Sequence, residues 1–406
     1  MKKINKKQSI FLLAGLCCLF SSCKELPPAE PFDPSNTRLH VVWSKSFYTD
    51  SSQAVMLAPI VTDRYVAVAG LSYGKSENHL VVFDKTNGER HPAWQNGAST
   101  ETNSIARSFL IGGNNKDVLF CTTSESIHAF SIPTGQSLWT SIYQGNNSFF
   151  RGETTLFGAD ILAISPINNV CYVDKYNSTT GQKTNLFSSN EYINTVQWTV
   201  NEQNDTLFFF LVGGENACCY NLTKDSIVWK NNIFDDNNYS SSTSFHPIIV
   251  ENKYVLFQHR YTVSCVDFST GKLIWQQRIG MTDYCSIFYY EDKVIVHPDY
   301  GNMSCYDVKT GKLLWENTDL NNSYNRNVKM DIYKGNLYLL IERGGGYYPP
   351  SYLYCISLAT GKVNWSDPGP DKGLYNNLTI DQQTGYLYCH SKQSVMCIDL
   401  NKTPKK

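Results

Sequence analysis

Short segments in which apolar and polar residues alternate run along almost the whole chain, and turn-forming residues separate them. This two-residue period predicts half-buried β-strands joined by tight turns. Between residues 320 and 366 it predicts four strands, at 328–333, 337–341, 352–357 and 363–365, with a turn over 334–336. The pattern indicates an all-β fold.

One four-strand unit recurs, and the clearest signature lies where its third strand turns into its fourth. A small residue stands two positions before Asp, Asn or Ser, then Thr-Gly follows, and a tryptophan closes the motif. A degenerate copy has Asp174 as the turn residue, Thr180-Gly181, and Leu186 in the tryptophan's place. The tryptophans recur at roughly the 40–50-residue spacing of a four-stranded propeller blade. The better copies span 82–94, 129–139, 219–229, 265–275, 305–315 and 355–365.

Each part of the motif has a physical reason. The Asp, Asn or Ser side chain caps the turn by accepting backbone N–H groups, and the glycine supplies a positive φ. The tryptophan then lies on the outer strand, where a large aromatic side chain can fill the seam between neighbouring blades. We therefore expect blade docking by seven tryptophans: Trp43, Trp94, Trp139, Trp229, Trp275, Trp315 and Trp365.

This pattern resembles the pyrroloquinoline-quinone (PQQ) type of propeller repeat over nearly all of residues 38–403. The resemblance implies a β-propeller with four antiparallel strands per blade. The last copy, residues 394–400, lacks an outer strand, and residues 40–43 have the form to supply it and close the ring. Seven complete units and this composite predict an eight-bladed propeller over 38–406; seven blades remain the alternative if the copy near Asp174 is spurious.

The first residues have the features of an export signal. Four lysines precede an apolar run at 10–20, which is shorter than the roughly 20 residues that a membrane span needs. Ser21-Ser22-Cys23 resembles a bacterial lipobox, which implies a signal peptide over 1–22 and acylation, for example with palmitate, at Cys23. The proline-rich residues 23–37 predict an extended tether. A plain secretory peptide with a chance cysteine is the alternative.

Composition argues against nucleic acid as a partner. The whole chain has a net charge of −1, and without residues 1–22 it would carry 31 basic against 36 acidic residues. No basic run remains that could follow a phosphate backbone. The lipobox instead implies a membrane as one partner, at the outer membrane, on either its periplasmic or its exposed face.

The cysteines are predicted to be small buried residues rather than disulfides. Five of them occupy the same small-residue position in different blades, which a ring holds apart; they are Cys219, Cys265, Cys305, Cys355 and Cys397. The adjacent pair Cys218-Cys219 is similar to the vicinal disulfide of PQQ-dependent alcohol dehydrogenases. Because Cys219 is in register with the buried position, we expect no cofactor there. Cys285 and Cys389 could pair with neighbours, and the sequence leaves this open.

Neither a metal site nor catalytic machinery is predicted. The eight histidines lack the spacing of metal ligands, and no nucleophile elbow or phosphate-binding loop is present. Two loops stand out by length, 71–78 with one tyrosine and 344–352 with three. They join second to third strands and, as the two tyrosine-rich loops, are candidate contact surfaces. We expect these loops on nearly opposite blades, which favours a broad docking face. The candidate residues are Tyr73, Tyr347, Tyr348 and Tyr352.

The leading functional hypothesis is a non-catalytic, membrane-anchored scaffold for protein–protein interaction. The chain resembles the propeller lipoproteins of the outer-membrane β-barrel assembly machinery in its repeat and its anchor, although fold does not fix function. A surface glycan-binding or adhesion lipoprotein is one alternative, suggested by the tyrosine-rich loops. A PQQ-dependent oxidoreductase is the other, and the sequence disfavours it.

Overall fold

The computed structural model describes most of the chain beyond residue 36. Within the described residues the only helical segment is the 3-10 turn η2 (Pro92–Trp94), and no helix among them is long and apolar enough to span a membrane. The described ranges are 37–46, 53–55, 57–72, 77–95, 97–100, 108–123, 125–142, 154–212, 216–233, 247–259, 262–279, 285–298, 301–320, 330–342, 351–367, 377–390, 394–402 and 404.

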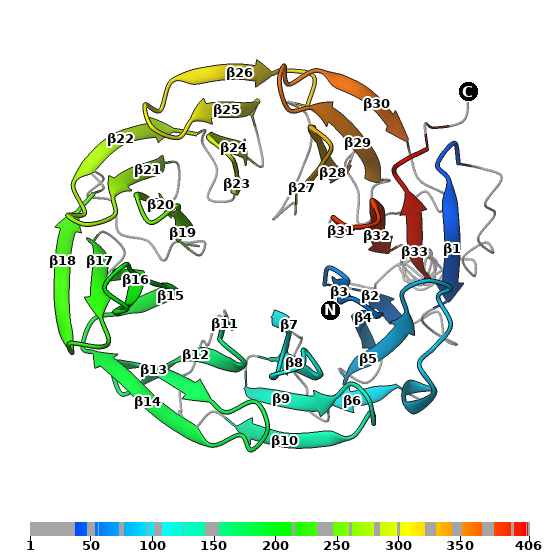
Figure 1. Cartoon of the computed structure of the whole chain (residues 1–406), viewed down its shortest axis with the longest axis horizontal. Helices are drawn as coiled ribbons and strands as arrows, with labels where there is room; N and C mark the ends of the chain where they lie inside the picture. The colour runs from blue at the N-terminus through cyan, green and yellow to red at the C-terminus, as the bar shows by residue number, and fades with distance from the viewer. Residues whose placement is uncertain are drawn as a thin grey trace, which may run out of the picture. The chain divides into compact units, whose positions relative to one another are not determined.

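The strands form eight antiparallel sheets arranged as the blades of a closed ring (Figure 1). This confirms the predicted eight-bladed propeller, and the copy near Asp174 is a complete blade rather than a spurious one. Blade 1 is the exception to a simple four-strand sheet, because its inner position holds two short strands, β2 and β3, that both pair with β4.

Blades are numbered here in chain order, and each runs from the centre of the ring outward. Blade 1 comprises β2 (Gln53–Val55), β3 (Ile60–Val61), β4 (Tyr65–Ser72), β5 (Glu77–Asp84) and β6 (Ala98–Thr100). Blade 2 comprises β7 (Ser108–Gly112), β8 (Val118–Thr122), β9 (Ser126–Ser131) and β10 (Ser137–Ile142). Blade 3 comprises β11 (Thr154–Phe157), β12 (Asp160–Ile167), β13 (Val170–Tyr176) and β14 (Lys183–Ser189). Blade 4 comprises β15 (Ile193–Val200), β16 (Thr206–Val212), β17 (Asn216–Asn221) and β18 (Ser226–Asn232).

The second half of the ring repeats this plan. Blade 5 comprises β19 (Ile248–Val250), β20 (Tyr254–His259), β21 (Thr262–Asp267) and β22 (Leu273–Arg278). Blade 6 comprises β23 (Cys285–Tyr290), β24 (Lys293–Pro298), β25 (Met303–Asp307) and β26 (Leu313–Asn317). Blade 7 comprises β27 (Met330–Tyr333), β28 (Asn336–Glu342), β29 (Ser351–Ser357) and β30 (Val363–Asp367), close to the four strands predicted there. Blade 8 comprises β31 (Leu378–Asp381), β32 (Tyr386–His390), β33 (Ser394–Asp399) and, from the start of the chain, β1 (Val41–Ser46).

The ring closes through β1, as the sequence predicts. β1 pairs antiparallel with β33, so that Trp43 lies opposite Cys397 and Ser44 opposite Met396. The outer strand of the last blade therefore comes from the beginning of the chain. This pairing leaves no blade incomplete, and separating β1 from β33 would open the circle.

The apolar core lies between the blades rather than within one central cluster. Each seam buries the aliphatic and aromatic side chains of two neighbouring sheets; between blades 4 and 5, for example, Phe209 and Trp229 pack with Phe257 and Phe268. Strands buried on both faces carry nearly continuous apolar runs, such as residues 207–212 of β16. The seams consequently carry most of the hydrophobic stabilisation of the ring.

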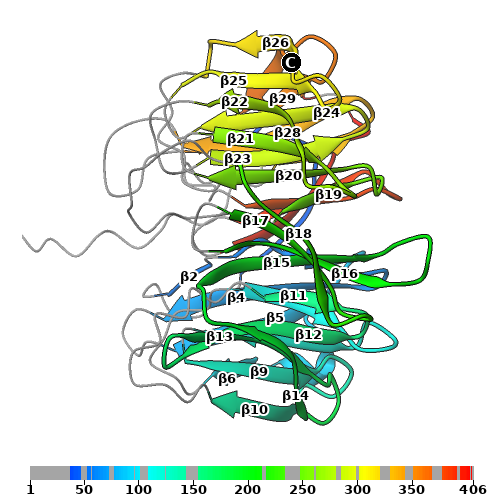
Figure 2. The same cartoon turned by 90° about the vertical axis from the view of Figure 1, so that its left-hand side faces the viewer.

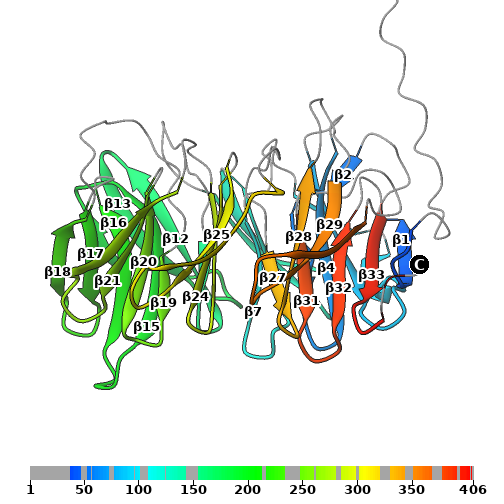
Figure 3. The ribbon, with the colours of Figure 1, turned by 90° about the horizontal axis from the view of Figure 1, so that it is seen from above.

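The turns gather on two faces. The hairpins that join first to second strands and third to fourth strands point to one face, at the lower edge of Figure 3. The β15–β16 hairpin extends beyond its neighbours on this face (Figures 2 and 3). The connections between second and third strands leave from the other face.

Candidate functional site

The most repeated arrangement in the molecule is a hydrogen bond that crosses a seam. At six seams the tryptophan Nε1–H of one blade donates to the backbone oxygen of the residue after the turn-capping position of the next blade, at 2.7–3.1 Å. The donors are Trp43, Trp94, Trp139, Trp229, Trp275 and Trp315, and the acceptors are Lys85, Ile132, Ser178, Phe268, Val308 and Leu358 in the same order. Each indole thus fixes the position of its neighbouring blade.

Glycine is needed beside these indoles for two reasons. Gly271 has a φ of +66°, and a Cβ atom built on it would lie 2.4 Å from the ring of Trp229. The turn glycines of blades 1, 3, 6 and 7 lie against the preceding tryptophan in the same way. The glycine of the motif in one blade therefore contacts the tryptophan of the motif in the preceding blade, and not the tryptophan of its own blade.

Trp94 makes the same hydrogen bond across its seam although its local structure differs. It lies in the 3-10 turn η2 and not on an outer strand, contrary to the expectation for this blade. Pro92 removes a backbone donor and the His91 side chain accepts from Ala93 N, which together favour this turn. Trp94 is nonetheless fully buried and donates to Ile132 O at 2.7 Å.

The degenerate copy in blade 3 needs two corrections. Its turn is capped by Asn177, whose side-chain Oδ1 accepts from Thr179 N and Thr180 N, and not by Asp174. Phe187, and not Leu186, lies opposite Val173 at the position that tryptophan has in other blades. The hairpin is regular for two more residue pairs before its bulge, and the buried Asp174 instead pairs with Asn185 and Lys183.

The seam between blades 3 and 4 is held by aromatic side chains on the outer strand β14 and on the inner strand β15. Phe187 packs on Phe208, Phe210 and Tyr220 of blade 4 with ring centroids 4.6–5.5 Å apart. Trp198 on the innermost strand β15 donates its Nε1–H back to Leu156 O of blade 3 and packs edge-on against Phe157. This eighth tryptophan lies outside the motif, so the repeat pattern gave no signal for it.

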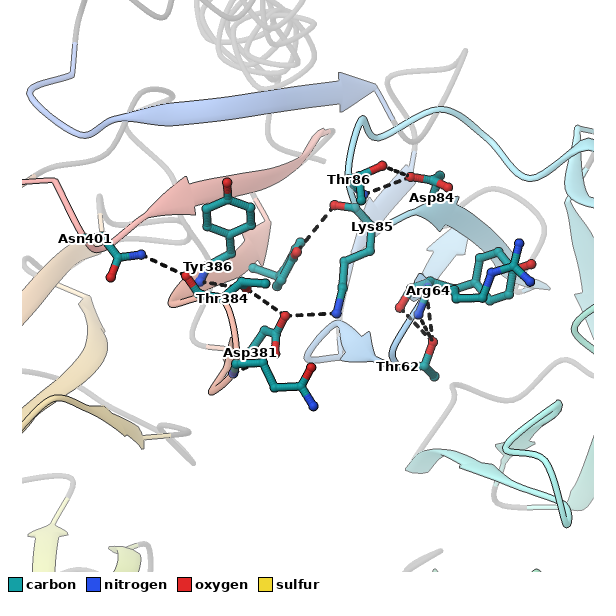
Figure 4. Close-up of polar contacts among 12 residues, drawn as sticks. Thr62, Arg64, Asp84, Lys85, Thr86, Asp381, Thr384, Tyr386 and Asn401 are labelled. Atoms are coloured by element: carbon teal, nitrogen blue, oxygen red, sulfur yellow. Dashed lines mark hydrogen bonds and ion pairs between the residues drawn. The ribbon is translucent and has the colours of Figure 1, made fainter.

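A buried ion pair joins the first and last blades beside the closing strand (Figure 4). Lys85 Nζ lies 2.9 Å from Asp381 Oδ2, and both side chains are 9% exposed. The Lys85 carbonyl accepts from the indole of Trp43 and from the hydroxyl of Tyr388. Burial alone would raise the pKa of Asp381, but hydrogen bonds from Thr384 and Lys85 outweigh it, and the pKa is lowered. The carboxylate therefore stays charged opposite Lys85.

The start of the propeller is fixed to blade 7 by a second buried carboxylate. Asp367 at the end of β30 accepts from Thr37 Oγ1 at 3.0 Å and from the backbone N–H of Arg38 at 3.3 Å. The Arg38 side chain lies 3.6 Å from the same carboxylate and donates to Ser366 O. The chain thus reaches β1 at a defined place, the outer edge of blade 7. The nearby Trp365 is half-buried and packs against Tyr338.

The ten described cysteines are all buried, and none of them forms a disulfide. Cys218 and Cys219 are adjacent on β17 and form no disulfide. Burial raises the pKa of Cys218 to about 12 and that of Cys219 further, which keeps both thiols protonated and unreactive near neutral pH. Neither Cys285 nor Cys389 forms a disulfide.

Among the described residues, no group of three or more His, Cys, Asp or Glu side chains could hold a metal ion. A cleft of about 740 Å³ lies between the inner strands of blades 4 and 5, lined by Gln197, Thr199, Ile249, Asn252 and neighbouring residues. Its one carboxylate belongs to Glu251, which is exposed and pairs with Lys253. The cleft is therefore an amide- and aliphatic-lined gap rather than an acid–base centre.

The candidate interaction tyrosines are only partly within the described residues. Tyr352 lies on β29, is half-buried and packs against Tyr354; Tyr73, Tyr347, Tyr348 and the lipidation candidate Cys23 lie outside the described ranges. The strands that bound the two loops do correct one expectation. They belong to blades 1 and 7, which flank blade 8 and are not opposed across the ring. The predicted order of the repeats already implied this, because the first and the seventh of eight blades both neighbour the composite blade.

The chain is an eight-bladed propeller built from PQQ-type repeats. A family model described as outer membrane protein assembly factor BamB matches residues 214–403, and the chain resembles that protein. BamB from Moraxella catarrhalis is similar in structure, with a TM-score of 0.61 and 15% identity over 90% of this chain and 98% of that one. The family model is that of an assembly factor, and at 15% identity the likeness in structure shows the fold alone.

Other solved propellers share the fold alone. The designed protein Ika8 has a TM-score of 0.62 and 11% identity, covering 89% of this chain and all of that one. A europium-containing methanol dehydrogenase has a TM-score of 0.59 and 13% identity, covering 90% of this chain and 94% of that one. A search of curated proteins finds no match.

Proposed function

We propose that the protein is a non-catalytic scaffold, attached to the outer membrane by an acylated Cys23, that binds an envelope protein. The match of residues 214–403 to the BamB family model carries this proposal. The lipobox-like Ser21-Ser22-Cys23 and the proline-rich residues after it support the attachment.

The placement of the two tyrosine-rich loops supports a single docking surface. The second and third strands that bound each loop meet at the same face of the ring, and only blade 8 separates the two blades. Tyrosine is enriched at protein interfaces because it combines a large apolar ring with a polar tip. We infer that Tyr73, Tyr347 and Tyr348 contact one partner together across the closing blade, with Tyr352 supporting the second loop.

Two measurements in the native host test the proposal. Metabolic labelling with a palmitate analogue should mark the wild-type chain and not the Cys23→Ser variant. Affinity purification of the tagged chain should recover an envelope protein, and a triple variant with Tyr73, Tyr347 and Tyr348 changed to alanine should recover at least about tenfold less, as expected for loss of central interface residues.

Tyr192 provides the matched control, because it is an exposed tyrosine at the start of blade 4. Tyr192→Ala should leave recovery of the partner unchanged. Equal recovery by the triple variant and the wild type would contradict the docking surface, and failure of the wild type to incorporate label would contradict the anchor.

A further inference from the structure

The seam between blades 7 and 8 has a tryptophan of the motif that lacks the usual hydrogen bond. Trp365 is half-buried and packs against Tyr338, and its indole makes no hydrogen bond within the described part of the chain. At six other seams the indole of the preceding blade donates to a backbone oxygen. Something other than the tryptophan therefore fixes the outer part of this seam.

Leu39 takes the place that glycine has in an ordinary hairpin. In blade 6 the N–H of Asp307 donates to the backbone oxygen of Lys312, which follows the hairpin glycine. In blade 8 the N–H of Asp399 donates to the backbone oxygen of His40 at the same distance, 2.9 Å. His40 thus corresponds to Lys312, and the residue before it, Leu39, corresponds to the glycine.

A leucine at this position excludes the indole from its usual place. A Cβ atom built on the blade 6 glycine, Gly311, would lie 2.7 Å from the ring of Trp275, so a side chain there and an indole in its ordinary place cannot coexist. Leu39 is 3% exposed and belongs to the apolar cluster of this seam, against which Trp365 packs. The leucine side chain therefore replaces the glycine–indole contact of the other seams.

One buried carboxylate holds residues 37–39, which we call the strap. Asp367 is 1% exposed and accepts from Thr37 Oγ1 at 3.0 Å and from the N–H of Arg38 at 3.3 Å. Thr37 is itself 5% exposed, and its Oγ1 accepts from Leu39 N at 3.1 Å. The strap is thus fastened to blade 7 at its start and continues into β1 of blade 8 at its end.

The inner half of the same seam is held separately. Asp331 on β27 accepts from Ile380 N at 2.8 Å, and Gln382 Nε2 donates to Ile332 O at 2.8 Å. These contacts join the inner parts of blades 7 and 8 without the strap. Loss of the strap contacts therefore leaves the two blades joined and releases only the outer half of the seam.

We propose that the strap opens and closes the outer half of this seam as a local event, with Asp367 as its fastening point, while the rest of the ring stays closed. Cys355 reports on that event, because it lies opposite Trp365, is 2% exposed and belongs to the cluster of this seam. An alkylating reagent reaches this thiol only while the strap is open. Cys265 and Cys305 hold the same repeat position in the two preceding seams and serve as internal references.

The test labels the folded, full-length chain with iodoacetamide and follows each cysteine by peptide mass spectrometry. Thr37→Val removes the hydroxyl and keeps the shape. It should speed the labelling of Cys355 at least about tenfold, as expected for loss of a hydrogen bond to a charged group. Thr37→Ser keeps the hydroxyl and should label at the wild-type rate. Labelling of Cys265 and Cys305 should stay the same in both variants.

Thr310→Val is the matched control in an ordinary hairpin. Thr310 Oγ1 donates to Asp307 Oδ1 at 2.7 Å and accepts from Lys312 N at 3.3 Å, so the same kinds of bond are lost. That hairpin borders the seam of Cys265, which the indole of Trp275 still holds through its bond to a backbone oxygen. Labelling of Cys265 should therefore stay at the wild-type rate.

Asp367→Asn gives an independent check, because it removes the charge and one of the two acceptors. It should speed the labelling of Cys355 as Thr37→Val does; if it does not fold, the two Thr37 variants decide. Three results would overturn the proposal: unchanged labelling of Cys355 in Thr37→Val, an equal rise at Cys265 and Cys305, or Thr37→Ser labelling as fast as Thr37→Val.

Discussion

Gly271 illustrates how one residue can meet two separate demands. Its φ of +66° favours glycine by conformation, and its contact with Trp229 excludes a Cβ by space. Gly335 has nearly the same φ, +70°, but a Cβ built there meets nothing within 4 Å. Substitutions at the two positions therefore separate two contributions to stability: the cost of the left-handed backbone conformation and the cost of crowding the indole at the seam.

We expect Gly335→Ala to lower the free energy of unfolding by about 1–2 kcal/mol, the cost of a left-handed conformation. Gly271→Ala should lower it by a further ~1–3 kcal/mol, because the added methyl group overpacks the indole. Urea denaturation of both variants measures the difference. Equal losses would show that the glycine–indole contact contributes nothing beyond the turn.

His128 should make the stability of the ring sensitive to mild acid. Burial lowers the pKa of this imidazole to about 4, and it lies between the hydroxyls of Ser126 and Thr140. The unfolded chain binds a proton near pH 6.5, whereas the folded chain resists it down to about 4. Stability from this group is therefore present above about pH 6.5 and is lost as the pH falls towards 4.

His297 behaves similarly, since burial lowers its pKa to about 4 as well. The free energy of unfolding should accordingly fall between pH 6.5 and 4, before the turn aspartates lose charge. His128→Asn should reduce the slope of that decrease, measured as denaturation midpoints across the pH range. An unchanged slope would mean that the imidazole titrates normally in the folded chain.

At the scale of elements, the repeat could be recognised from the sequence because each seam uses the same few residues. The turn cap, the glycine and the tryptophan lie close together along the chain. Their pattern can therefore be recognised in a single segment, without knowing which blades lie next to it. Blade 3 was misassigned by one residue at Leu186 because its hairpin stays regular for longer, and the sequence does not show where a bulge falls. Trp198 was missed because it lies on the inner strand β15, outside the repeat motif, with no turn cap or glycine beside it in the sequence to mark it.

The closing seam between blades 8 and 1 depends on the buried pair Lys85–Asp381. Lys85→Met should lower the free energy of unfolding by about 3–5 kcal/mol, because it leaves the buried Asp381 carboxylate without its counter-ion. The double variant Lys85→Met with Asp381→Asn should recover most of that loss, since neither charge remains. Thermal or urea denaturation measures both.

The same seam also holds an exposed pair, Lys45–Glu89, which serves as a comparison. Lys45→Met should cost less than about 1 kcal/mol. If Lys85→Met lowers the free energy of unfolding no more than Lys45→Met does, the buried pair makes no special contribution to closure of the ring.

At the scale of the whole molecule, the ring brings together segments that the sequence keeps far apart. The two tyrosine-rich loops are more than 250 residues apart along the chain, yet the strands that bound them belong to blades on either side of blade 8. The sequence allowed the blades to be counted and the closing blade to be assigned, and that order already put the two loops in the first and seventh of eight blades; the expectation of opposed blades misread it. A docking face across the closing blade is therefore a property of the assembled ring.

Site-specific photo-crosslinking in living cells tests the proposed scaffold role most directly. A photoreactive amino acid is placed in turn at positions 73, 347 and 192. We expect the first two positions to crosslink the same envelope protein and position 192 to give no such product. Crosslinks to that protein from all three positions, or from none, would contradict a single protein-docking face spanning blades 7, 8 and 1.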